Sequence, residues 1–161
     1  AVSWPNTIKA DSTPRPQFHH VIDIAPTVLE AAGLPEPSVV DGVEQRPIEG
    51  VSMRYSFDDA KATERHATQY FEMFGNRGIY HEGWVACTRH SLPWLMVPLP
   101  ALKDDVWELY NVNEDFSQAN NLAASNPDKL KELKQKFNEG IVNPQENPEN
   151  LMSKVFVRSP H

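Results

Sequence analysis

The stretch that decides the fold of this chain reads Glu108-Leu109-Tyr110-Asn111-Val112-Asn113-Glu114-Asp115 and continues to Asn121-Leu122-Ala123. Its apolar and aromatic start predicts a short strand that delivers Leu109 and Tyr110 to a core. The polar residues that follow predict a turn, and a helix-forming segment comes after the turn. The stretch therefore predicts a junction at which a sheet ends and the chain passes to its last helix.

A sheet of four antiparallel strands is predicted around this junction. Residues 67–74 carry the aromatic and β-branched side chains typical of a strand, and they end at the turn dipeptide Gly75-Asn76. Short turns that contain glycine are typical of an antiparallel meander. The other three strands are expected from Arg77 to Tyr80, from Trp84 to Thr88 and from Val106 to Val112, and a proline-containing ordered loop is expected over residues 91–105.

A helix over residues 127–139 is predicted to cover one face of this sheet. Asn126 is a favourable N-cap, and Pro127 fits the first helical position because its missing N–H would be unpaired there in any case. An apolar face opposite a lysine-rich one predicts packing across the sheet. The side chains of that face are Leu130, Leu133 and Phe137.

A second helix is predicted nearer the start of the chain, over residues 20–32, where apolar residues recur at spacings of three and four. Asp23 is a suitable N-cap for the regular part of this helix, since Pro26 is tolerated only near the first turn. Gly33 is expected to be the left-handed C-cap, and Pro35 prevents continuation. The apolar stripe of the helix has no sheet in this chain to cover it, so we expect it to be exposed.

These elements predict an α+β fold and divide the chain into three parts. Residues 1–65 are expected to hold a strand end at Ala1–Trp4, the helix over 20–32, loops, and a helical turn near Ser52–Tyr55. Residues 66–140 form a small subdomain of four strands and one helix, and residues 141–161 an irregular tail.

Composition excludes several classes of function. The 161 residues carry a net charge of −7, which argues against a nucleic-acid partner because such binders concentrate Lys and Arg on one face. Nothing approaches the length of apolar sequence that spans a membrane. Cys87 is the only cysteine, so no intrachain disulfide is possible and the compartment stays undetermined. The first residue is not Met, and we expect the chain to have been cut from something longer.

The closest set of candidate metal ligands is His19, His20 and Asp23. Two or three ligands at helical spacing can bind a transition metal, but a structural zinc site needs four, and a catalytic one needs three and a water. The favoured interpretation is that His20 precedes the helix and Asp23 caps it. We therefore assign no metal ligand.

Cys87 and two pairs of adjacent carboxylates are the other candidates for catalytic groups. On a strand Cys87 and Arg89 share one face while His90 points to the other, so the favoured role of Cys87 is that of a small apolar side chain. Neighbouring residues on an extended chain point apart, which disfavours an acid–base dyad at Asp58-Asp59 or Asp104-Asp105. Solvated turns or helix caps are the expected roles of both pairs.

The polar pair Asn76 and Arg77, at the first hairpin, is the most attractive candidate for contact with an anion. A guanidinium beside a glycine-containing turn can reach an oxygen of sulfate or phosphate. An ordinary hairpin with an exposed arginine explains the same residues.

Five segments, in the order of the family, resemble the C-terminal third of type I sulfatases, and together they reach from residue 1 to about residue 140. The stretch from Glu108 to Ala123 is similar to the E-L-Y-D-L-x-x-D-P-x-E-x-x-N-L signature of that family. The other four are Val2-Ser3-Trp4-Pro5, the helix Asp23–Gly33 (D-L-x-P-T-L-L-x-L-A-G in the family), the loop Ile48-Glu49-Gly50-Val51-Ser52, and Gln69–Arg77 followed by Trp84.

The resemblance implies the end of an alkaline-phosphatase-like α/β domain, followed by the four-stranded sheet and its helix. It implies a parent enzyme, an arylsulfatase, that hydrolyses sulfate monoesters with a formylglycine and a calcium ion. The C-x-P-S-R segment of the nucleophile and the Asp and Asn residues that hold calcium are absent from this sequence, and Cys87-Thr88-Arg89 lacks the Pro-Ser pair. We assign no catalytic residue, and we expect Asn76, Arg77, Thr88 and His90 to face the substrate opening.

The leading interpretation is a C-terminal part of an arylsulfatase that is inactive as an isolated chain and serves to complete the fold. Its expected partner is the remainder of the sulfatase chain or a self-associating copy, and the parent's substrate is a sulfate ester. A stand-alone binding module with a sulfatase-derived fold is the main alternative. A phosphodiesterase or phosphomutase relative fits the Leu-Tyr signature less well.

Overall fold

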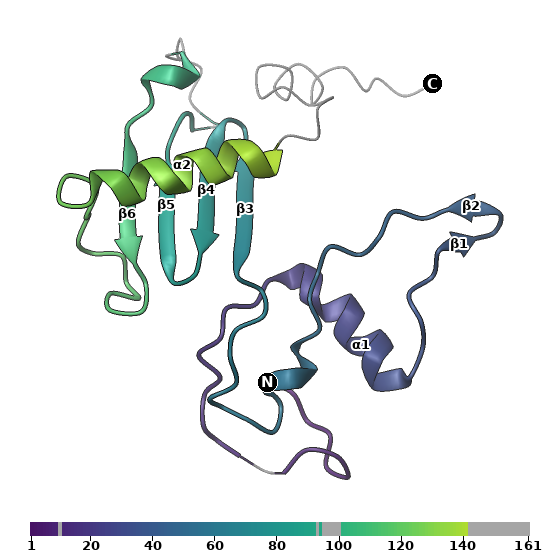
Figure 1. Cartoon of the computed structure of the whole chain (residues 1–161). Coiled ribbons are helices and arrows are strands. Elements are labelled where there is room, and N and C mark those ends of the chain that lie inside the picture. The colour runs from purple at the N-terminus through teal and green to yellow at the C-terminus, as the bar shows by residue number, and fades with distance from the viewer. Residues whose placement is uncertain (10, 93, 95–100, 142–161) are drawn as a thin grey trace. The chain divides into compact units, whose positions relative to one another are not determined.

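The computed structural model describes residues 1–9, 11–92, 94 and 101–141. The chain forms two compact units, Ala1–Ala67 and Thr68–His161, and each is described by itself (Figure 1). Residue 93 and residues 95–100 of the predicted loop, and residues 142–161 of the predicted tail, lie outside the described residues.

The second unit contains the predicted sheet of four antiparallel strands, in the order β3-β4-β5-β6. One helix, α2, crosses one face of the sheet, as Figure 1 shows. The predicted fold is therefore confirmed, with strand ends shifted by at most one residue. The elements are β3 Thr68–Met73, β4 Asn76–His81, β5 Trp84–Thr88, β6 Trp107–Asn111 and α2 Pro127–Ile141.

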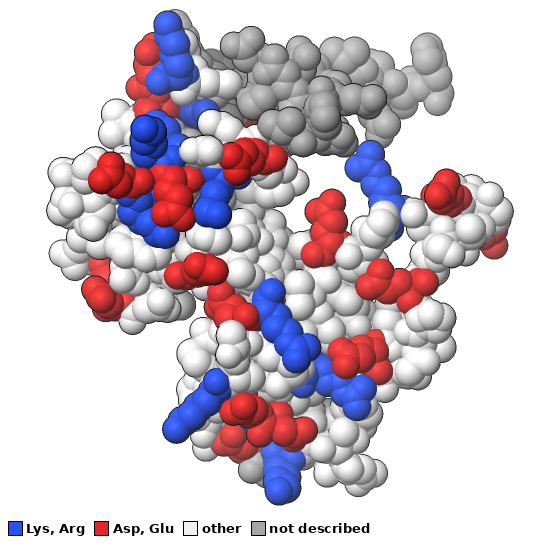
Figure 2. Space-filling model, viewed as in Figure 1, with Lys and Arg blue, Asp and Glu red and all other residues white. Residues whose placement is uncertain are grey.

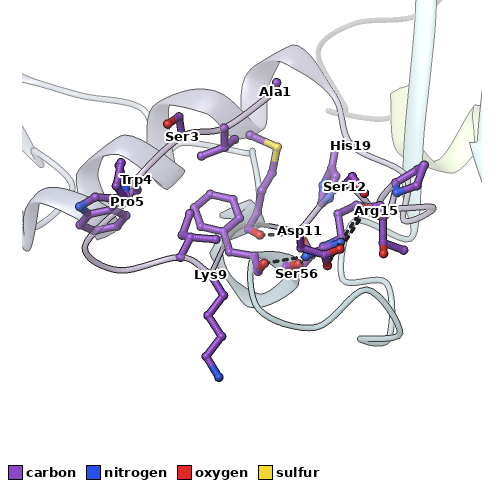
Figure 3. A pocket seen from close by; sticks show the side chains of 16 residues that line it. Ala1, Ser3, Trp4, Pro5, Lys9, Asp11, Ser12, Arg15, His19 and Ser56 are labelled. Atoms are coloured by element: carbon purple, nitrogen blue, oxygen red, sulfur yellow. Dashed lines mark hydrogen bonds and ion pairs between the residues drawn. The ribbon is translucent and has the colours of Figure 1, made fainter.

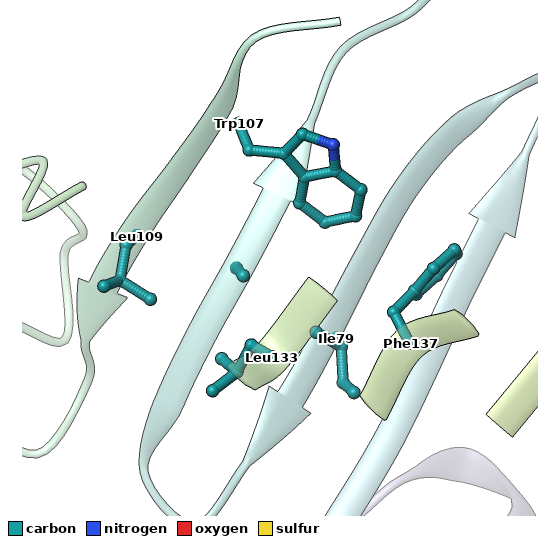
Figure 4. Close-up of a cluster of buried hydrophobic side chains, with 6 residues drawn as sticks. Ile79, Trp107, Leu109, Leu133 and Phe137 are labelled. Carbon is teal, nitrogen blue, oxygen red and sulfur yellow. The ribbon is translucent and has the colours of Figure 1, made fainter. Parts of the chain in front are cut away.

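The core of this unit lies between the sheet and α2 (Figure 4). Leu133 and Phe137 come from the predicted apolar face of the helix, and the ring of Phe137 meets that of Trp107 edge to face, with centroids 5.6 Å apart. Leu130 packs against the same cluster. The sheet contributes Ile79, Ala86, Trp107 and Leu109.

The stretch from Glu108 to Ala123 forms the junction between sheet and helix that its pattern predicts. Leu109 is completely buried in β6, and its carbonyl accepts a hydrogen bond of 2.7 Å from the backbone N–H of Leu122. The side-chain oxygen of Asn121 accepts from the N–H of Leu109 at 3.1 Å. Asn121 thus fastens the segment that leads to α2 onto the last strand.

The first unit is built on short elements and loops. The predicted helix divides into a turn of 3-10 helix, η1, and the α-helix α1, which ends at Gly33 with φ of 68°, so the predicted left-handed C-cap is confirmed. The helical turn expected near Ser52 is confirmed as η2, whose N-cap is Ser52. The elements are η1 Val21–Asp23, α1 Ile24–Ala32, β1 Val39–Val40, β2 Val43–Glu44 and η2 Met53–Ser56, and the second unit adds η3 Leu102–Asp104.

One prediction for the first unit is wrong, and one of its elements was not predicted. Residues 1–4 form no strand. The carbonyl of Trp4 instead accepts from Thr7 and Ile8 in a turn, and no described strand lies beside residues 1–4 to pair with them. The hairpin of β1 and β2 was not predicted, because each strand has only two residues and the sequence shows only the turn at Asp41-Gly42.

Apolar side chains on η1 and α1 are exposed, as expected. Val21, Ile24 and Val28 are 67%, 51% and 59% exposed. No helix among the described residues is long and apolar enough to cross a membrane. On the face of the molecule in Figure 2, acidic and basic side chains are intermixed, and neither sign forms a continuous patch there.

Candidate functional site

The four residues predicted to face the substrate opening lie close together at one end of the sheet in the second unit. Asn76 and Arg77 begin β4, and Arg77 is the register partner of Thr88 at the end of β5. His90 follows β5 by two residues, and its backbone N–H donates to the side-chain oxygen of Asn76 at 2.9 Å. The sequence identified these residues without showing what joins them.

The carboxylate of Asp105 joins two of these residues, Arg77 and His90. Its carboxylate oxygens lie 3.0 and 3.1 Å from Nδ1 of His90, and Nη2 of Arg77 donates to the same carboxylate. The side chains of Asp105 and His90 are only 1% and 2% exposed. An ionised carboxylate only accepts hydrogen bonds, so Nδ1 of His90 carries the hydrogen that faces Asp105.

The prediction that Asp104-Asp105 is a solvated pair is wrong for Asp105. Asp104 is exposed, whereas Asp105 turns into the fold beyond the last residue of η3. Neighbouring residues point apart, as predicted, and the inward one meets a guanidinium 28 residues earlier in the chain. Local sequence carries no sign of such a partner. Asp58 and Asp59 are exposed and follow the prediction.

Arg77 is engaged within the fold. Its Nη2 also donates to the carbonyl of Leu102 at 2.8 Å, and its guanidinium lies over the ring of Trp107, 5.3 Å from the centroid. The carboxylate of Asp105 balances its charge. The side chain is 14% exposed, so little of the guanidinium is available to a solvent anion.

Thr88 closes the same end of the sheet. It is buried, and its hydroxyl donates to the carbonyl of Val106 at 2.7 Å, just before β6 begins. Thr88 therefore links β5 to the segment that carries Asp105.

The ring of His90 packs against Gly75 in the turn between β3 and β4. Phe74 and Gly75 have φ of 55° and 82°, the two positive values that a two-residue type I′ hairpin requires. A Cβ on Gly75 would lie 2.6 Å from Cδ2 of His90, so only glycine permits this approach. The hydroxyl of Ser91 donates to the carbonyl of Phe74 at 2.9 Å, and the ring of Phe74 is exposed.

A second buried histidine–aspartate pair lies in the first unit. Asp23 is completely buried, and its carboxylate accepts from the backbone N–H groups of His20 and Val51, each at 2.8 Å. Nδ1 of His66 lies 2.7 Å from Oδ1 of Asp23. Burial opposes ionisation, but these donors outweigh it and hold the pKa of Asp23 below its usual value. Asp23 occupies the N-cap position of α1, yet its side chain makes no capping bond to that helix.

His19 completes this cluster. Its Nδ1 lies 3.8 Å from Asp23, and burial lowers the pKa of the imidazole. Neither ring nitrogen of His19 makes a hydrogen bond in the structure. Within the described residues, no three His, Cys, Asp or Glu side chains form a group that could hold a metal ion. The sequence missed His66 because it lies 43 residues beyond Asp23.

A cavity of about 1070 Å³ opens in the same unit beside His19 (Figure 3). Its wall is largely apolar, and the one arginine in it is engaged: Nε and Nη2 of Arg15 donate to the carbonyls of Ser56 and Phe57 at 2.6 and 2.8 Å. The apolar part of the wall includes Val2, Trp4, Ile8, Met53 and Phe57.

Cys87 does not have the setting of a nucleophile. Its neighbour Ala86 faces α2, so Cys87 lies on the opposite face of the sheet, with Glu108 as its register partner. Burial, assisted by the charge of Glu108, raises the pKa of the thiol. Burial and a hydrogen bond of 2.9 Å to Glu108 raise the pKa of Tyr110 to about 12. These groups stay protonated near neutral pH.

Comparison with known proteins gives a consistent result. The family model described as N-sulphoglucosamine sulphohydrolase, C-terminal, matches residues 1–147. An uncharacterized sulfatase of Schizosaccharomyces pombe is 31% identical over 134 residues, which cover 82% of this chain and 22% of the relative. The chain thus spans about a fifth of the length of that curated relative.

Solved structures are similar at lower identity. One comes from work on the metabolism of multiple glycosaminoglycans by Bacteroides thetaiotaomicron; it is 19% identical, with 70% of this chain and 23% of that chain covered and a TM-score of 0.46. Another, of a protein in complex with its substrate D-glucosamine-2-N,6-O-disulfate, is 23% identical, with 84% and 24% covered and a TM-score of 0.45.

Proposed function

Because the chain belongs to the N-sulphoglucosamine sulphohydrolase C-terminal family, the C-terminal domain of sulfatases, we propose that it completes and shapes an enzyme that hydrolyses sulfate monoesters. In this proposal the groups that break the sulfate ester bond lie outside the chain. The observation that carries the proposal is the match of a sulfatase C-terminal model to residues 1–147. The identity of 31% to a sulfatase over 82% of the chain supports it.

The formylglycine and calcium of a type I sulfatase do not fit the residues of this chain. Cys87 lacks the C-x-P-S-R sequence, and its thiol is disfavoured as a thiolate by burial and Glu108. The buried carboxylates of Asp23 and Asp105 are already engaged by N–H donors, whereas calcium takes six to eight oxygen ligands. We assign both groups to another part of the parent enzyme.

The end of the sheet that carries Asn76, Arg77, Thr88 and His90 is the part of the domain proposed to border the substrate opening. Arg77 and Thr88 keep their polar atoms within the fold, so their contribution is to hold strands β4 and β5 and the start of β6 in place. A rigid border of this kind restricts the orientation of a bound ester.

The proposed partner of the chain is the remainder of a sulfatase. The exposed apolar side chains of α1 and the apolar cavity in the same unit are surfaces that another polypeptide can bury. A second copy of the chain can cover the same surfaces when the remainder is missing.

The test compares the complete product of the gene that encodes this chain with a form from which the chain is deleted. Hydrolysis of para-nitrophenyl sulfate is measured for both, and folding of the truncated form is checked by circular dichroism. We expect turnover by the complete product and a loss to background in the truncated form. Full activity of the truncated form, or no sulfatase activity in the complete product, contradicts the proposal.

A further inference from the structure

Phe74 stands in a backbone conformation that aromatic residues rarely adopt. Its φ is 55°, in the left-handed region, where a bulky side chain is strained. The residue keeps 42% of its surface exposed, so its own domain covers the ring only in part. A strained residue that leaves much of its ring open to contact points to a role outside that domain.

The same two-residue turn occurs three times among the described residues, which gives Phe74 an internal comparison. At one of the other two turns Asp41 has φ of 51° and Gly42 of 80°. At the other, Glu82 has φ of 47° and Gly83 of 83°. Both place a charged residue before the glycine, as suits an exposed turn. The turn at Phe74-Gly75 alone among these three carries an aromatic residue there.

We propose that Phe74 contacts the ring of the alcohol part of the sulfate ester and so sets the preference of the enzyme for esters of ring-bearing alcohols. This inference rests on the proposed function, because it assumes that this end of the sheet borders the substrate opening. An exposed, rigidly held aromatic ring binds the flat face of another ring by stacking and by apolar contact.

Asp105 and His90 act in this proposal as positioning residues for the turn. The carboxylate of Asp105 holds the imidazole of His90 in place by a hydrogen bond, and the imidazole packs against Gly75. The neighbouring Ser91 holds the carbonyl of Phe74 at 2.9 Å. Two further bonds secure the hairpin: the side chain of Glu72 accepts from Gly75 at 2.7 Å, and that of Asn76 donates to Met73 at 2.9 Å.

Arg77, in contrast, does not contact the substrate. Its guanidinium is balanced by Asp105 and lies over Trp107, and the exposed fraction of its side chain is 14%. The contact that this end of the domain offers is therefore apolar and aromatic, and recognition of the sulfate group belongs to the rest of the enzyme.

The experiment measures KM and kcat of the complete gene product with para-nitrophenyl sulfate, which has a ring, and with ethyl sulfate, which has none. For Phe74→Ala we expect KM for the ring ester to rise about three- to tenfold, the equivalent of a lost aromatic contact. We expect kcat to stay within about twofold and the parameters for ethyl sulfate to be unchanged. Met73→Ala, which removes an exposed apolar neighbour, is the matched control and leaves both esters unaffected.

Phe74→Gly separates a substrate contact from a packing role. Glycine removes the strain, so we expect the same rise in KM with no fall in melting temperature. An unchanged KM for both esters, or equal losses for both esters together with a lower melting temperature, overturns the inference. The second of these results identifies Phe74 as a packing residue between parts of the enzyme. If the wild-type enzyme hydrolyses neither ester, the proposed function itself fails.

Discussion

Nδ1 of His66 lies 2.7 Å from Oδ1 of Asp23, and this carboxylate is completely buried. The contact joins the end of the first unit to the start of α1, and the backbone N–H of Val51 adds a third segment to the same carboxylate. Asp23 therefore organises a unit in which regular secondary structure is sparse. Its charge is central to the stability of that unit.

Stability of the first unit is expected to decrease in acid. The pKa of Asp23 is held below its usual value in the folded chain, so the unfolded chain binds the proton more tightly. The stabilisation is complete above the ordinary aspartate pKa of about 4 and is lost as the pH falls through the lower folded value. The free energy of unfolding of wild type and Asp23→Asn, measured with urea across this range, is expected to converge in acid. A difference that does not change with pH contradicts this expectation.

The packing of α2 on the sheet gives a second prediction. Leu133 is completely buried, and Leu133→Ala is expected to lower the free energy of unfolding by about 2–5 kcal/mol through lost burial and a cavity. Lys131→Ala, at an exposed position of the same helix, is expected to change it by less than about 0.5 kcal/mol. Urea denaturation, followed by a spectroscopic signal of the second unit, measures the free energy of unfolding of both variants. Equal effects of the two substitutions show that α2 does not pack as described.

The approach of Gly75 to His90 gives a third prediction. Gly75→Ala meets both an unfavourable positive φ and the buried ring of His90, whereas Gly83→Ala meets the same φ and an exposed Asn113 side chain that can move aside. Gly75→Ala is therefore expected to destabilise by at least about 1 kcal/mol more than Gly83→Ala. Thermal unfolding of the two variants compares them. If Gly83→Ala is equally costly, His90 does not support the turn.

Self-association of the isolated chain is the fourth prediction. Val21 of η1 and Ile24 and Val28 of α1 expose apolar surface whose contact with water is unfavourable. We expect multi-angle light scattering to show dimers or larger species, and the double variant Ile24→Lys, Val28→Lys to shift them toward monomer. Ala25→Lys, at another exposed position of α1, is the control for added charge. A monodisperse wild-type monomer contradicts the prediction.

The sheet and α2 were predictable because their information is local. Aromatic and β-branched side chains and glycine turns mark the strands, and the three- and four-residue spacing of Leu130, Leu133 and Phe137 marks the buried face of the helix. The same applies to Gly33, where a left-handed C-cap follows an apolar helix and precedes Pro35.

The buried polar contacts were not predictable in the same way. Asp105 and Asp104 look alike in sequence, and only the turn after η3 sends one inward and leaves the other exposed. His66 pairs with Asp23 across 43 residues, and no local pattern encodes such a distance. The sequence selected Arg77 and His90 as candidates, and it offered Arg77 either as a contact for an anion or as an ordinary exposed arginine. Neither interpretation included the pairing of Arg77 with Asp105 that the fold makes.

The central claim is that this domain shapes a sulfatase without carrying out its chemistry. The most direct test is the release of para-nitrophenol from para-nitrophenyl sulfate by the purified 161-residue chain, with the complete gene product assayed beside it. We expect the isolated chain to match buffer while the complete product turns the ester over. Turnover by the isolated chain that persists through repurification would place catalytic groups within it and contradict the account, and loss of that turnover in Cys87→Ala would identify the thiol as one of these groups.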